Sequence, residues 1–157
     1  MVVNQTPMAT IDTRLKLILD FNPRKATRDA INWGPNTDII EDMNKAQLLD
    51  GKKANGEDMP KYEQFTLKNK PSQFIPSNKS YSLKDKGKLH NLIIATANMS
   101  SLSITSTDSD KNEKLQHNGP GESVKEEEAF GLTEENRDLM NKKLIIPFMH
   151  RRLRGEV

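Results

Sequence analysis

Residues 51–90 constrain the fold of this 157-residue chain more than any other stretch. The segment contains three prolines, three glycines and nine lysines against four acidic residues, and it shows no helical or strand period. Forty residues of this kind are unusual inside a compact domain. We therefore expect residues 51–90 to form an extended arm or partner-binding loop, and the core to come from periodic segments on either side of it.

Three helices are predicted before the arm. The first contains four aliphatic residues spaced at i, i+4, i+7 and i+8, which share one helical face: Ile11, Leu15, Ile18 and Leu19. Residues 24–34 predict a second, short helix that stops before Pro35. Asn36 or Thr37 can cap a third helix, and Gly51 is placed to end it. Residues 1–10 precede these helices and are expected to be flexible.

The segments after the arm predict a hairpin and a helix. Residues 92–97 and 102–107 are β-rich and separated by a short polar stretch, so we expect an antiparallel pair with a half-exposed second strand. Residues 108–128 are predicted to form a polar loop. Thr133 then caps a final helix, which Pro147 should kink or end because proline lacks the backbone N–H.

These elements predict a single domain of α+β class over residues 1–157. N-terminal helices and a C-terminal helix would pack on a small antiparallel sheet. Hydrophobic residues make up 34% of the chain and charged residues 29%, which indicates a modest core. No apolar run approaches the roughly 18–20 residues that span a bilayer. We therefore expect a soluble protein that is made in a cytoplasm and has no membrane contact.

The sequence contains no recognisable pattern of catalytic residues or metal ligands. There are no cysteines, which excludes disulfides, thiolate metal sites and cysteine nucleophiles. His90, His117 and His150 are too dispersed to suggest a metal site, and each is expected to be exposed or hydrogen-bonded. Residues 108–112 match the start of an EF-hand loop, but the later ligand positions do not, so a solvated loop is favoured. We predict no enzyme activity, no cofactor and no bound metal.

Opposed charges and aromatic residues favour a role in binding. Residues 51–90 carry a net charge of +5 and residues 122–135 a net charge of −5, which suits pairing between copies or with a protein partner. Four aromatic residues of the arm and two apolar residues before the final helix are the candidate interface residues: Tyr62, Phe65, Phe74, Tyr81, Phe130 and Leu132. For Phe130, core packing is the favoured alternative.

A second hypothesis is that the chain binds single-stranded nucleic acid. Lysines can contact phosphates and aromatic rings can stack on bases, and residues 51–90 contain both. The C-terminal residues Arg151, Arg152 and Arg154 are further candidate nucleic-acid contacts. The net charge of the whole chain is only +2, however, which does not by itself indicate a nucleic-acid binder. Protein contact is therefore the favoured hypothesis.

Several short motifs resemble, in their order and spacing, a family of bacteriophage virion-morphogenesis proteins. The resemblance covers about residues 36–154. The motifs are a helix with an aspartate–glycine turn (residues 38–51), a loop with Gly56, Tyr62, Thr66 and Lys70, a glycine–x–leucine entry to the sheet (residues 87–89), a strand (residues 104–108), a loop (residues 115–119) and the start of a closing helix (residues 130–136).

This resemblance implies a tail-completion or neck protein, that is, a head–tail connector with an α+β fold. Such a protein is one copy of a ring between portal and tail, and it is found in the virion after assembly in the host cytoplasm. The implied partners are further copies of the same chain and the portal, adaptor or tail proteins of the virion. Passing contact with packaged DNA is also implied.

Overall fold

A computed structural model describes residues 11–84, 86–116 and 123–157, and it confirms the α+β class. The expectation of a flexible segment at residues 1–10 lies outside the described residues. The elements are α1 (Ile11–Leu19), α2 (Pro23–Ile31), α3 (Gly34–Leu49), α4 (Gln64–Asn69), a 3-10 turn (Ser72–Phe74), α5 (Lys88–Asn91), β1 (Ile93–Ala97), β2 (Leu102–Ser106), α6 (Lys111–Gln116), α7 (Glu126–Ala129), α8 (Glu134–Met140), a π turn (Asn141–Ile145) and α9 (Ile146–Leu153).

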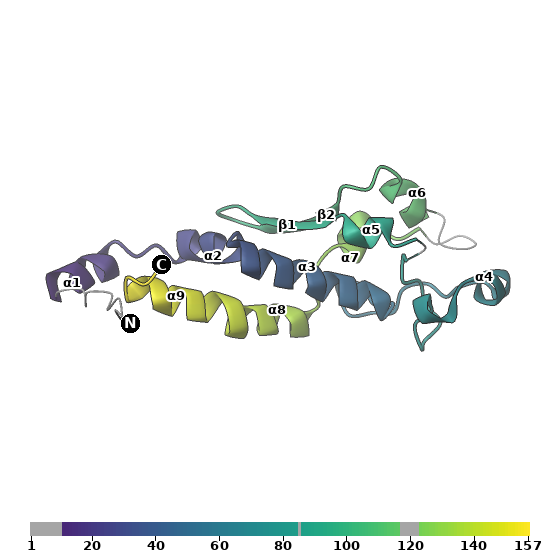
Figure 1. Ribbon diagram of the computed structural model, residues 1–157, viewed down its shortest axis with the longest axis horizontal. Coiled ribbons are helices and arrows are strands. Elements are labelled where there is room, and N and C mark those ends of the chain that lie inside the picture. The colour runs from purple at the N-terminus through teal and green to yellow at the C-terminus, as the bar shows by residue number, and fades with distance from the viewer. Residues whose placement is uncertain (1–10, 85, 117–122) are drawn as a thin grey trace, which may run out of the picture.

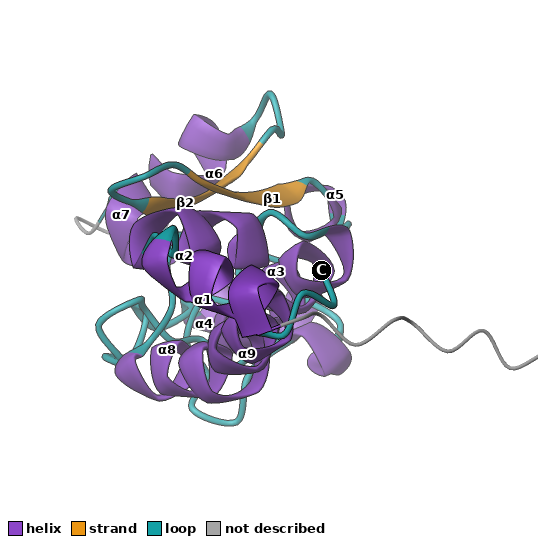
Figure 2. Cartoon of the chain, turned by 90° about the vertical axis from the view of Figure 1, so that its left-hand side faces the viewer, coloured by secondary structure: helices purple, strands orange, loops and turns teal. Residues whose placement is uncertain are grey.

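The molecule is elongated and layered along its length (Figure 1). The β1–β2 hairpin lies on one side of α2 and α3, and α8 and α9 run back along the other side. Seen from one end, the hairpin and α8–α9 are separated by α2 and α3 (Figure 2). The middle layer is therefore covered on both faces, which explains why Ala30, Ile40 and Leu48 have no exposed surface.

The first helices begin at residues suited to helix starts. Asn22 caps α2, because its side-chain oxygen accepts a hydrogen bond of 3.0 Å from the backbone N–H of Lys25. Helix α3 begins at Gly34, two residues before the earliest predicted cap, since Pro35 is tolerated in a first helical turn. Asn36 instead donates a side-chain hydrogen bond to the carbonyl of Ala30, which fixes the corner between α2 and α3.

The hairpin forms as predicted and packs on α3. Ala95 lies opposite Ile104 in the antiparallel register, and both side chains are buried. Side chains from the helices occupy the outer edge of β1. Glu41 accepts a hydrogen bond from the N–H of Ala95, and Asn32 bonds both the N–H and the carbonyl of Ala97. Three backbone groups of that edge are thus satisfied by helical side chains.

Pro147 neither ends the final helix nor leaves it purely α-helical. A π turn over Asn141–Ile145 precedes α9, and the N–H of Ile146 bonds the carbonyl of Asn141, five residues back. Pro147 then lies in the first turn of α9, where its missing N–H removes no α-helical bond. The wider turn lets the helix continue past Pro147 to Leu153. The sequence had predicted an end or a kink at Pro147.

The prediction that the core lies outside residues 51–90 is wrong. Five residues of this segment belong to the same buried cluster as the helices: Met59, Tyr62, Tyr81, Leu83 and Leu89. Short helices occupy part of the segment, at one end of the molecule (Figure 1). Helical periodicity could not reveal this, because the buried residues are held by isolated bridges and turns rather than by a long helix.

The predicted polar loop at residues 108–128 also contains structure. Helix α6 lies in this stretch and buries Leu115, and the first three residues of α7 also fall within it. The N–H of Val124 bonds the carbonyl of Leu115, which joins the two described parts of the stretch. Each helix is one or two turns long, too short for an apolar period to be visible in the sequence.

Two side-chain amides of α3 hold the start of α8, and we call them the amide clamp. Asn44 donates a hydrogen bond of 2.8 Å to the carbonyl of Gly131, and Gln47 donates one of 3.0 Å to the same oxygen. Gln47 also accepts a hydrogen bond of 2.9 Å from the N–H of Thr133. A Cβ on Gly131 would lie 2.9 Å from the Cβ of Ala54, so a larger residue has no room there.

We expect Gly131→Ala to lower the free energy of unfolding by about 1–3 kcal/mol, the usual effect of overpacking a filled site. The added Cβ would push residues 130–133 away from Ala54 and strain the amide clamp. Urea unfolding followed by circular dichroism measures the change. Gly34→Ala is the matched control, because no atom lies within 4 Å of its added Cβ. Equal stabilities of the two variants would contradict the prediction.

Candidate functional site

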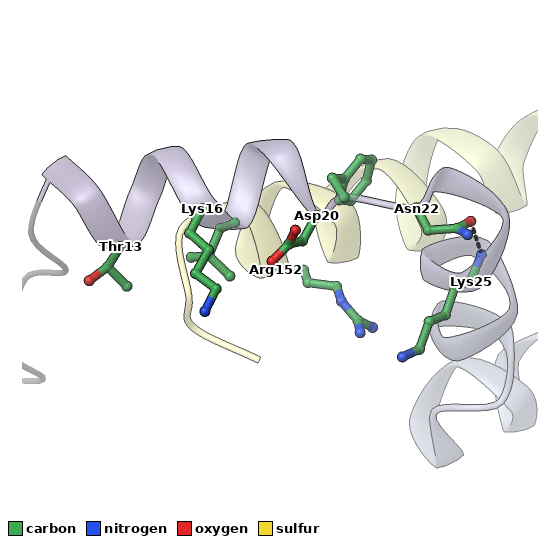
Figure 3. A pocket seen from close by; sticks show the side chains of 8 residues that line it. Thr13, Lys16, Asp20, Asn22, Lys25 and Arg152 are labelled. Atoms are coloured by element: carbon green, nitrogen blue, oxygen red, sulfur yellow. Dashed lines mark hydrogen bonds between the residues drawn. The ribbon is translucent and has the colours of Figure 1, made fainter.

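The first helix presents its apolar face to solvent. Its four aliphatic residues, which we call the α1 stripe, keep large exposed fractions: Ile11 85%, Leu15 54%, Ile18 60% and Leu19 75%. Residues on the opposite side of α1, including Thr13, Lys16 and Asp20, line a cavity of about 280 Å³ against Arg152 (Figure 3). Leu17 of α1 and Phe21 just after it line the same cavity and are half-buried, so this end of the chain contacts the body through these two apolar residues while the other apolar residues of α1 face outward.

This orientation reverses the expected one, because the apolar stripe of a surface helix normally faces the core. The prediction that the stripe supplies core residues is wrong. Helix α1 lies beyond the end of the layers that bury α2 and α3, and Leu17 alone among its leucines is half-buried. A Cβ on Gly155 would touch Leu17 at 3.5 Å, which marks where α1 meets the C-terminal residues.

A second candidate surface is a groove beside β2, and its lining is partly apolar. We call it the hairpin groove; its volume is about 490 Å³ and it is lined by Ala54, Asn55, Leu102, Ile104, Glu127, Glu128, Phe130, Gly131, Leu132 and Arg137. Phe130 and Leu132 are each 5% exposed and form part of the groove lining. Core packing of Phe130 is thus confirmed. Glu127 is exposed and Glu128 is half-buried.

The aromatic residues of the predicted arm divide into buried and exposed ones. Tyr62 and Tyr81 are buried with ring centroids 4.4 Å apart, so neither ring is available as an interface contact on this surface. Phe74 is half-buried beneath the ammonium group of Lys84, at 5.1 Å. Phe65 is 76% exposed and remains a candidate contact.

The three C-terminal arginines make contacts within the chain. Arg152 pairs with Asp29 at 2.5 Å and so joins α9 to α2. The guanidinium of Arg151 lies 4.8 Å from the ring centroid of Trp33. Arg154 pairs with Glu156 at 2.6 Å. Burial opposes ionisation of Asp29, but hydrogen bonds from Arg28 and Arg152 outweigh it and lower the pKa of Asp29.

Among the EF-hand-like residues, Asp108 is buried and paired with lysines, whereas Ser109, Asp110 and Asn112 are exposed. The side chain of Asp108 has no exposed surface, and its carboxylate pairs with Lys88 at 3.1 Å and with Lys114. Burial would raise the pKa of Asp108, but hydrogen bonds from these two lysines lower it to about 2. Within residues 11–84, 86–116 and 123–157, no group of three or more metal-ligating side chains comes together.

His90 is hydrogen-bonded, as predicted, and buried. Its Nε2 lies 2.7 Å from the carbonyl oxygen of Ser82, whose hydroxyl donates to the carbonyl of Phe74. Burial lowers the pKa of His90 to about 4, against the opposing effect of the Ser82 hydrogen bond. His150 is exposed on α9, and His117 lies outside the described residues.

Comparisons with known proteins return no relative of this chain: no protein-family model, no curated protein and no solved structure matches it. In the part of the chain that the structure describes, no helix is long and apolar enough to cross a membrane. The α1 stripe and the hairpin groove are therefore interpreted from their own geometry. Sequence periodicity identified the stripe as one helical face but could not show that this face points outward.

The free energy of unfolding is expected to decrease by about 3 kcal/mol as the pH falls from about 6.5 to about 4. In this window the unfolded chain binds a proton at His90, whereas burial keeps His90 neutral in the folded chain. Urea unfolding near pH 7 and near pH 4.5 measures the change. His90→Gln should abolish most of it, and His150→Gln, at an exposed histidine, should not. Equal pH dependence in both variants would contradict this assignment.

Proposed function

We propose that the chain is a structural component of a bacteriophage virion, a neck or tail-completion protein that acts as one copy of a head–tail connector ring. The observation that carries the proposal is the α1 stripe. A folded chain that leaves one aliphatic helix face exposed to water has a surface suited to a neighbouring subunit. Its expected location is the virion, and its expected neighbours are portal, adaptor or tail proteins.

The positions of the resembling motifs support the same proposal. The helix with the aspartate–glycine turn is α3, and the start of the closing helix is residues 130–136, which the amide clamp joins to α3. Gly51 has φ +65° and a Cβ there would lie 2.8 Å from the Cβ of Ser80. Two glycines of the resembling motifs, Gly51 and Gly131, thus lie where a side chain would collide with its neighbours.

Nucleic-acid binding is the weaker alternative, because the residues that it needs are engaged within the chain. Among the arm's lysines, Lys52 and Lys61 pair with Asp58, and Lys53 pairs with Glu128. The rings of Tyr62 and Tyr81 are buried and cannot stack on bases in this conformation.

A mass-spectrometric inventory of purified phage particles tests the proposed function. We expect the chain in the particles at a few to about a dozen copies, as a closed ring of identical subunits requires. Absence of the chain from intact particles would contradict the proposal.

Oligonucleotide binding by the purified chain tests the alternative. We expect weak binding, because most of the basic side chains described above already have partners. Tight binding that falls steeply with salt would favour the nucleic-acid function instead, since counterion release gives such a slope. Titration of a fluorescent single-stranded oligonucleotide at two salt concentrations measures this.

A further inference from the structure

We propose that the α1 stripe of one copy docks into the hairpin groove of a neighbouring copy, so that copies join head to tail. The inference rests on the proposed function, for which it names the contact between subunits. It starts from two surfaces of the same chain: an aliphatic helix face without a partner and a partly apolar groove without an occupant among the described residues.

The two surfaces match in shape and character. The nine residues of α1 span about 13 Å at the usual rise per residue, and the four stripe residues project from one side. The hairpin groove, at about 490 Å³, has the size of cavities that bury apolar ligands. Leu102, Ile104 and Leu132 supply apolar contacts along its lining. Docking would remove Leu15 and Ile18 from water, and apolar burial is the dominant driving force of such contacts.

The charges around the two surfaces are complementary. Residues 11–32 and 150–157, at the α1 end, contain eight lysines and arginines against four acidic residues. Residues 123–135 contain five glutamates and one lysine, and two of these glutamates, Glu127 and Glu128, line the hairpin groove together with Arg137. A basic end would thus meet an acidic segment, which favours contact between copies and orients it.

The positions of the two surfaces determine the kind of assembly. Helix α1 lies at one end of the elongated molecule, whereas α7, beside the groove, lies toward the other end (Figure 1). A contact between different patches of identical subunits is heterologous, so each copy offers one stripe and one groove. Repetition of such a contact builds a ring when the rotation closes.

Sedimentation of the purified full-length chain over a range of concentrations tests the proposal. We expect assemblies larger than two copies. Leu15→Asp on the stripe and Leu102→Asp in the groove should each weaken self-association at least tenfold. Ile39→Asp, which changes an exposed aliphatic residue of α3 outside both surfaces, should not. Glu127→Lys is a second groove variant with an exposed side chain, so a folding defect in Leu102→Asp leaves the test intact.

A mixture of variants separates the alternatives. Leu15→Asp chains keep an intact groove and Leu102→Asp chains keep an intact stripe, so together they should form a complex of two copies and no more. Glu127→Lys can replace Leu102→Asp in this mixture.

Three results would overturn the proposal: a wild-type chain that stays monomeric throughout, groove variants that assemble normally while Leu15→Asp does not, or folded variants that fail to pair. The second result would indicate stripe-to-stripe dimers. The chain's presence in phage particles would still support the proposed function in each case.

Discussion

Two side-chain amides of α3, Asn44 and Gln47, hold the chain together where its distant segments meet. They bind the backbone of Gly131 and Thr133, about 85 residues further along, and thereby fix where α8 starts. The arrangement is specific, but it leaves one buried polar atom without a hydrogen bond, which lowers stability. The Oδ1 atom of Asn44 is buried without a hydrogen-bond partner, and rotating the amide would instead bring this oxygen against the carbonyls of Ala129 and Gly131.

The amide clamp explains how a chain with a modest core holds its helical layers in fixed positions relative to one another. Helices α8 and α9 run back along α2 only because residues 130–133 turn the chain at the far end of α3 (Figure 1). The ion pair between Arg152 and Asp29 fastens the other end of the same layer. The buried apolar side chains of α2, α3, α8 and α9 pack between these two contacts. Helix α1 lies beyond the Arg152–Asp29 pair and buries little of its surface against the core.

Periodic patterns predicted the helix at residues 11–19, the short helix within residues 24–34, the hairpin and the Thr133 cap, because each depends on local spacing or on a single capping residue. The same patterns missed the structure within residues 51–90, where Tyr62 and Tyr81 meet across a turn-rich segment. They also could not orient α1. Helical spacing shows which residues share a face, but the direction of that face depends on tertiary contacts that lie outside the helix.

The side chains on the outer edge of β1 affect how the chain resists aggregation at high concentration. An unsatisfied strand edge can recruit strands from other molecules and seed aggregation. Here Asn32 and Glu41 occupy the N–H groups that an incoming strand would need. The hairpin is thereby closed to β-augmentation on that side. At high concentration, copies of the chain are therefore not expected to grow into amyloid-like ribbons from this edge.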